Sequence, residues 1–114
     1  MLSDRSRQAL ADMRDNLILA REFTTGFTLE TFRADRRTFY AVTRCLEIIS
    51  EAARRLPDTL IERHPELPWR AILDAGNVYR HKYDDVAEEI VWQTVQNSLA
   101  PLLQTVNREL EVAR

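Results

Sequence analysis

The chain has 114 residues, of which 45% are hydrophobic and 30% charged, so it is long enough for one domain with its own hydrophobic core. A net charge of −2 argues against a general nucleic-acid-binding protein, and a single cysteine, Cys45, excludes an intrachain disulfide. The charged N-terminal residues differ from a secretory signal, and no apolar run approaches the roughly 20 residues of a membrane-spanning helix. We therefore expect one cytoplasmic domain over residues 1–114, with no segment in a membrane.

Charge is distributed unevenly along the chain. Residues 1–56 carry a net charge of +2, whereas residues 57–114 carry −4. Fifteen of the sixteen basic residues are arginines, whose planar guanidinium groups suit bidentate contacts with phosphates. The densest basic cluster consists of Arg33, Arg36 and Arg37, which we predict to contact substrate phosphates; a solvated helix face is the alternative.

The first predicted helix spans residues 4–23. Its apolar residues recur at steps of three and four, which is the spacing of one face of an amphipathic helix: Leu10, Met13, Leu17 and Ala20. Residues 24–27 are typical of a turn in which Gly26 stops the helix, and Thr28 can cap the helix that follows.

The second predicted helix runs without interruption from Thr28 until Pro57 stops it. Its apolar residues form a heptad-like seam: Phe32, Phe39, Val42, Leu46, Ile49, Ala53 and Leu56. Such a seam usually packs along another helix, either in the core, which we favour, or across a two-fold contact between subunits.

The next part of the chain predicts shorter elements. Residues 57–68 contain three of the four prolines and indicate a connector with one short helical turn in the middle. Pro68 suits the first position of a helix that extends to about Val78, with Trp69 and Ile72 facing inward.

The C-terminal part predicts two more helical segments. Asp84 or Asp85 caps a helix whose apolar residues are Val86, Ile90, Val91 and Val95. Pro101 either kinks that helix or begins the next one. Because no segment alternates with period two for long enough to form a strand, the sequence predicts an all-α, compact bundle of about five helices.

The segment from residue 76 to residue 85 concentrates the side chains best suited to chemistry. Imidazole titrates near neutrality, so His81 can take a proton from a ribose 2′-hydroxyl and return one to a leaving group. Arg80 can stabilise charge that develops on a phosphate, and Asn77 can orient the ring or contact the backbone. In the alternative, Arg80 and Lys82 pair with acidic residues at the start of the next helix, and His81 has no chemical role.

Other catalytic patterns are absent from the sequence, which has no glycine-rich phosphate loop, no paired cysteines and no HExxH. The two histidines, His64 and His81, fall short of the four ligands of a structural zinc site, so we predict no metal. Cys45 lies between apolar neighbours in the second helix, which indicates a buried core residue rather than a nucleophile.

Asn77, His81 and Tyr83 stand at a recognisable spacing. The segment resembles the signature of the HepT-like toxins of the HEPN superfamily, which is an Arg-Asn pair, three variable residues, His, one variable residue and Tyr. The likeness extends in order along nearly the whole chain: Arg21, Phe32 with Asp35, the stretch from Arg44 to Ala53, Pro68-Trp69, the stretch from Ile90 to Trp92 and that from Leu99 to Leu102. Gly76 replaces the Arg of the signature, so the adjacent Arg80 would have to supply a cation from a different backbone position.

The resemblance implies a HEPN-type fold and a homodimer in which the His-containing segments of two subunits meet in one cleft. It also implies the toxin of a type II or VII-like toxin–antitoxin pair that cleaves RNA without a metal or cofactor. His81 would act as acid and base, Arg80 would stabilise the transition state, and Asn77, Lys82 and Tyr83 would contact or position the RNA. The partner would be a minimal nucleotidyltransferase antitoxin, which can transfer AMP to the tyrosine two residues after the His, here Tyr83.

Two other functions stay open on the sequence alone. Gly76 favours a catalytically inactive HEPN subunit that partners the nucleotidyltransferase or holds RNA without cutting it. The other is a structural helical dimer in which the polar segment is a solvated corner. The sequence does not distinguish tRNA from mRNA as a substrate.

Overall fold

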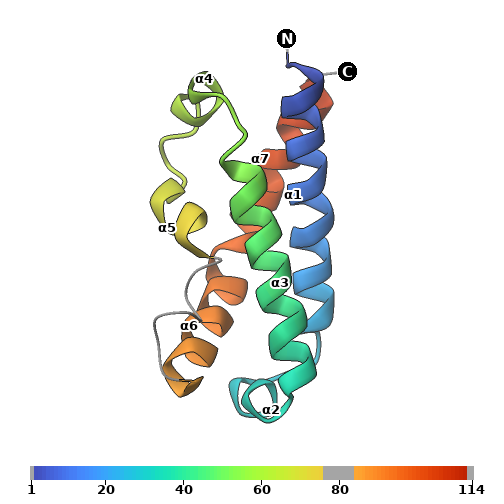
Figure 1. Ribbon diagram of the computed structural model, residues 1–114, viewed down its shortest axis with the longest axis vertical. Helices are drawn as coiled ribbons and strands as arrows, with labels where there is room; N and C mark the ends of the chain where they lie inside the picture. Colours follow the sequence, from blue (N-terminus) through green and yellow to red (C-terminus); the bar gives the residue numbers. More distant parts are fainter. Residues whose placement is uncertain (1, 76–83, 113–114) are drawn as a thin grey trace.

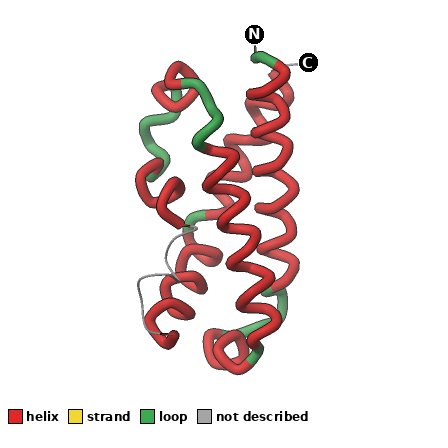
Figure 2. Tube along the Cα trace, in the orientation of Figure 1, coloured by secondary structure: helices red, strands yellow, loops and turns green. Residues whose placement is uncertain are grey.

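The computed structural model describes residues 2–75 and 84–112, and these form seven helices and no strand (Figures 1 and 2). The helices are α1 (Asp4–Phe23), α2 (Leu29–Ala34), α3 (Arg36–Ala53), α4 (Asp58–Glu62), α5 (Trp69–Asp74), α6 (Asp84–Asn97) and α7 (Leu99–Val112). Helix α1 packs lengthwise against α3 and α7, while α5 packs on α3 and α2 packs on α6 (Figure 1). The start of α1 and the end of α7 lie at the same end of this elongated bundle (Figure 1). The predicted all-α, compact class is therefore confirmed.

Helix α1 has the predicted bounds, and its apolar face lies in the core. Leu10, Met13, Leu17 and Ala20 are all buried, as the steps of three and four require. The Ser3 side chain caps the helix by accepting a hydrogen bond from the Ser6 N–H at 3.0 Å. The helix ends in the predicted turn, where Gly26 takes a φ of 83°, a conformation that favours glycine.

The single long helix predicted after Thr28 is wrong, because Asp35 divides it into α2 and α3. Thr28 caps α2 as predicted, in a capping box with Thr31. Asp35 then takes an extended conformation, with φ −112° and ψ 94°, and its carboxylate accepts a hydrogen bond from the Thr38 N–H at 3.1 Å. This bond is the main reason why the pKa of Asp35 lies below its ordinary value. A carboxylate at this position thus starts a new helix instead of continuing the old one.

The predicted seam packs in the core despite this break. Its seven members are all buried, although α3 ends at Ala53 and Leu56 follows in the turn beyond it. Phe32 is fully buried, and its ring centroid lies 5.9 Å from that of Phe39 and 5.4 Å from that of Trp92. These aromatic contacts join α2, α3 and α6, and α6 is the helix that follows the predicted catalytic motif in the chain.

The second half of the bundle agrees with the predicted order of elements. Helix α4 is the short turn expected in the connector, and α5 starts directly after Pro68 with Ile72 buried. The predicted continuation of α5 to Val78 lies outside the described residues. Pro101 is the third residue of α7, so it begins a new helix rather than kinking α6. Seven helices appear instead of about five because α2 separates from α3 and the connector turn forms a helix of its own.

Candidate active site

The polar motif lies between the end of α5 and the start of α6 in the chain. Its predicted catalytic and binding residues fall within residues 76–83, outside the described part of the structure: Asn77, Arg80, His81, Lys82 and Tyr83. Gly76, which replaces the signature arginine, lies there as well. Their roles stay predictions, and the structure shows how the helices on either side are held.

The end of α5 is fastened to α3 by two hydrogen bonds. The Ser50 hydroxyl donates to the carbonyl oxygen of Ile72 at 2.8 Å, and Arg54 Nη2 donates to the carbonyl oxygen of Leu73 at 2.6 Å. The last carbonyls of a helix lack the usual partners of the helix interior. Here the Ile72 carbonyl accepts from the Ala75 N–H as well as from Ser50 of α3, and Arg54, the residue directly after α3, donates to the Leu73 carbonyl. The chain therefore enters the motif from a fixed helix end.

The first turns of α6 are fastened to α2 and α3 by charge. Glu88 is only 4% exposed, and its carboxylate accepts a hydrogen bond from Arg36 Nη1 at 2.7 Å. Arg33 Nη2 lies 3.3 Å from Glu89 Oε2 in a more exposed pair. A buried carboxylate needs such a partner, because an unpaired charge in the core is costly. The chain thus leaves the motif into a helix held by arginines.

The three arginines predicted to contact phosphates lie on α2 and α3. Arg33 and Arg36 face α6 and bind Glu89 and Glu88, so much of their charge is matched within the protein. Arg37 is exposed and forms no ion pair with any residue in the described ranges. Contact with phosphate stays a prediction for all three. Arg37 is the one without an ion pair in the described ranges, although its charge helps to lower the pKa of Asp35.

Tyr40 is a surface residue that the sequence analysis missed. It is 62% exposed, and the guanidinium carbon of Arg36 lies 5.2 Å from its ring centroid. Arg36 also lies over the Phe39 ring, 4.9 Å from its centroid. The helical period contained the signal, since successive residues are turned by about 100°: if Phe39 faces the core, the next residue points away from it.

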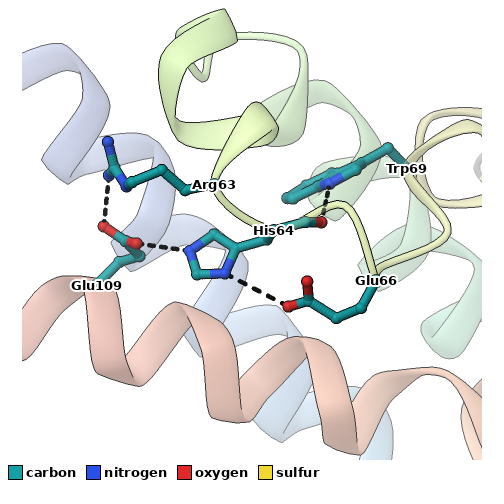
Figure 3. Close-up of polar contacts among 5 residues, drawn as sticks. All are labelled: Arg63, His64, Glu66, Trp69 and Glu109. Atoms are coloured by element: carbon teal, nitrogen blue, oxygen red, sulfur yellow. Dashed lines mark hydrogen bonds and ion pairs between the residues drawn. The ribbon is translucent and has the colours of Figure 1, made fainter.

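The second histidine belongs to a polar cluster between the α4–α5 connector and α7 (Figure 3). His64 Nε2 lies 2.6 Å from Glu109 Oε2, and its Nδ1 lies 3.5 Å from Glu66 Oε1. Arg63 Nη2 binds the other oxygen of Glu109 at 2.8 Å, and Trp69 Nε1 donates to the carbonyl oxygen of His64 at 2.8 Å. Burial raises the pKa of the Glu109 carboxyl, but the hydrogen bonds from Arg63 and His64 outweigh it and hold the pKa below its ordinary value. Because its Nε2 is hydrogen-bonded to Glu109, this histidine anchors the connector to α7.

The remaining chemical candidates have structural surroundings. Cys45 is buried, and this burial raises the pKa of its thiol, as expected for a core cysteine rather than a nucleophile. Across residues 2–75 and 84–112, no three His, Cys, Asp or Glu side chains gather in a way that could hold a metal ion. Within the same ranges, no helix is both long and apolar enough to cross a membrane.

The all-α bundle of the described residues and the spacing of Asn77, His81 and Tyr83 in the sequence are those expected of a HEPN-type domain. The family model described as Ribonuclease HepT-like matches residues 13–109, and the chain belongs to this family.

Relatives from three organisms are similar over most of the chain. A protein of Thermococcus cleftensis named "Probable ribonuclease HepT" is 36% identical over 93 residues, which is 82% of this chain and 84% of the relative. MJ0127 of Methanocaldococcus jannaschii, which carries RNase in its name, is 33% identical over 82% of this chain and 77% of its own length. TTE0752 of Caldanaerobacter subterraneus, also named as an RNase, is 32% identical over 79% of this chain and 80% of its own length. No solved structure is a significant match.

Proposed function

We propose that this protein is a metal-independent endoribonuclease, with His81 as its acid and base, and that it is the toxin of a toxin–antitoxin pair in the cytoplasm. The observation that carries the proposal is the spacing of Asn77, His81 and Tyr83 in a chain of the HepT-like ribonuclease family. The names of the relatives, which include ribonuclease or RNase, support RNA as the substrate.

In the proposed reaction, His81 takes the proton from a ribose 2′-hydroxyl. The 2′-oxygen attacks the adjacent phosphorus, the bond from phosphorus to the 5′-oxygen breaks, and a protonated imidazole returns a proton to that oxygen. The products are a 2′,3′-cyclic phosphate and a 5′-hydroxyl. Arg80 stabilises the charge on the phosphorane-like transition state in place of the arginine that Gly76 replaces, while Asn77 and Tyr83 position the RNA.

The anchoring of α5 and α6 supports a site between them. Catalytic groups must be held to within a fraction of an ångström, which requires rigid elements on both sides. Here Ser50 and Arg54 hold the end of α5, and Arg36 holds Glu88 of α6.

Growth and RNA integrity on induced expression in a bacterium test this proposal. The wild type should arrest growth and leave cleaved RNA, while His81→Ala should do neither. Arrest with cleavage by both forms would place the chemistry elsewhere.

The proposal includes two partners. In a homodimer, the His81 segments of two subunits would share one cleft, and analytical ultracentrifugation should give twice the mass of the chain. A minimal nucleotidyltransferase antitoxin would join AMP to the Tyr83 phenol, adding negative charge beside Arg80 and Lys82 that repels RNA phosphates. The intact mass of the toxin after co-expression should rise by one AMP, and Tyr83→Phe should abolish the increment.

Gly76 favours a second candidate, an inactive HEPN subunit that binds the nucleotidyltransferase or RNA without cutting. This candidate predicts normal growth and intact RNA for the wild type in the same experiment. Association with the nucleotidyltransferase would then survive His81→Ala.

A further inference from the structure

One face of α3 carries exposed arginines on both sides of an exposed tyrosine. Arg37, Tyr40 and Arg44 are separated by three and four residues, so they lie in a single row on the helix. Arg37 is exposed, Tyr40 is 62% exposed, and the Arg44 side chain is 61% exposed. We call these three residues the Arg–Tyr row.

The tyrosine ring of this row is already oriented. The Arg36 guanidinium lies over it at 5.2 Å and donates a hydrogen bond to the phenol oxygen at 3.5 Å. Arg36 is itself held by the buried Glu88 carboxylate. The Phe39 ring also packs against it at about a right angle, with 5.7 Å between the ring centroids, and the residue as a whole remains 62% exposed. Such an aromatic ring can accept a stacking partner with little loss of conformational freedom.

The charges along the row favour an anionic partner over a limited length. Arg37 has no ion pair within the described ranges. Arg44 lies 3.9 Å from Glu47, a long contact in which the arginine side chain stays 61% exposed, so it should contribute little in water. The next positions on the same face are acidic, Glu47 and Glu51, so the cationic part of the face ends at Arg44. A flat ring between two cations matches a nucleotide whose base stacks and whose neighbouring phosphates carry negative charge.

We infer that the Arg–Tyr row binds single-stranded RNA, with an unpaired base stacked on Tyr40 and the flanking phosphates on Arg37 and Arg44. The inference rests on the proposed function, and it narrows the substrate to single strands. In a duplex the faces of the bases are covered by their neighbours, so an aromatic side chain can stack only where a base is free. Arg36, which contacts Tyr40 of the row, also binds Glu88 of α6. Helix α6 follows the motif of the candidate active site directly in the chain.

Binding is tested in the full-length His81→Ala protein, so that cleavage does not interfere. Fluorescence anisotropy is measured with a labelled short RNA strand and with the same strand annealed to its complement. Each row substitution is added to this background: Tyr40→Ala, Tyr40→Phe and Arg37→Ala. Arg108→Ala is the matched control, because Arg108 is exposed on the last part of α7, at the opposite end of the bundle from the start of α3 (Figure 1).

The single strand should bind more tightly than the duplex, and Tyr40→Ala should weaken its binding by about fivefold or more, the usual effect of losing one base stack. Tyr40→Phe, which keeps the ring, should bind within about twofold of the parent. Arg37→Ala should also lower the slope of log affinity against log salt by about 0.7, the value for one phosphate contact on a single strand. Arg108→Ala should change neither the affinity nor the slope.

Equal binding by Tyr40→Ala and its parent would overturn the inference, as would equal binding of duplex and single strand. If a row substitution changes the oligomeric mass of the protein but leaves RNA binding unchanged, the inference is also overturned and the row is assigned to a protein contact. RNA cleavage by the wild type is measured in parallel. If the wild type cleaves RNA but binding does not depend on Tyr40, only the inference on the Arg–Tyr row is refuted. If binding depends on Tyr40 but the wild type does not cleave RNA, only the proposed nuclease activity is refuted.

Discussion

Glu109→Gln should destabilise the protein strongly, because Glu109 fastens α7 to the α4–α5 connector through two hydrogen bonds (Figure 3). The substitution keeps the volume of the side chain and removes its charge. The contact with His64 is 2.6 Å long between side chains that are 12% and 11% exposed, so its loss should cost about 1.5–3 kcal/mol. The Arg63 side chain is 50% exposed, and its contact should contribute only about 0.5–1 kcal/mol.

The expected total is therefore about 2–4 kcal/mol, a large part of the roughly 5–15 kcal/mol that stabilises a domain. For a chain of this length, thermal denaturation followed by circular dichroism at neutral pH should show Tm lower by about 8–16 °C. Glu111→Gln is the matched control, since Glu111 is an exposed residue of the same helix, and its Tm should stay within about 2 °C of the wild type.

The stability difference should also depend on pH. The pKa of Glu109 is lowered in the folded protein from an ordinary value of 4.5, so its contribution is fully present above that value and is lost as the pH falls through the folded pKa. The gap in Tm between wild type and Glu109→Gln should thus be present at neutral pH and should narrow as the pH falls below 4.5 and through the folded pKa. Equal Tm values at neutral pH, or a gap that persists unchanged in acid, would refute this account of the cluster.

Three further predictions concern single residues. Asp35→Ala removes the cap of α3 and should lower the midpoint of urea denaturation, whereas Asp35→Asn, which can still accept the hydrogen bond, should lower it much less; an equal loss in both variants would contradict the capping role. The buried Cys45 thiol should react with an aromatic disulfide reagent only slowly at pH 8 in the folded protein and rapidly in guanidinium, and fast reaction of the native form would contradict a place in the core. Gly76→Arg restores the arginine of the family signature and should raise the rate of RNA cleavage about tenfold or more, since a cation at the reacting phosphate stabilises the transition state; an unchanged rate would indicate that Arg80 already fills this role.

The faces of the long helices could be predicted from sequence because burial follows helical periodicity. Leu10, Met13 and Leu17 lie in the core for this reason. The break at Asp35 was missed because α2 and α3 bury the same seam, and one extended residue between them leaves the apolar spacing nearly unchanged. Only the competition of the Asp35 carboxylate for a backbone N–H reveals the break, and such competition leaves no period in the sequence.

The long-range polar contacts between helices could not be predicted from the sequence, for a different reason. Arg36 and Glu88 are separated by 52 residues, and His64 and Glu109 by 45. Pairs at such separations depend on how the helices pack, and a single sequence carries no local trace of them. The motif could be recognised in the sequence, where its role stays a prediction, because its members lie within seven residues of one another, from Asn77 to Tyr83.

The most direct test of the central claim is RNA cleavage by the purified protein in EDTA, with analysis of the new RNA ends. Wild-type protein should produce 2′,3′-cyclic phosphates and 5′-hydroxyls, and His81→Ala, purified in the same way, should leave the RNA intact. His64→Gln should still cleave, because His64 belongs to the Glu109 cluster between the α4–α5 connector and α7 and not to the motif of residues 76–83. Equal cleavage by wild type and His81→Ala, or a requirement for added divalent metal, would contradict the account.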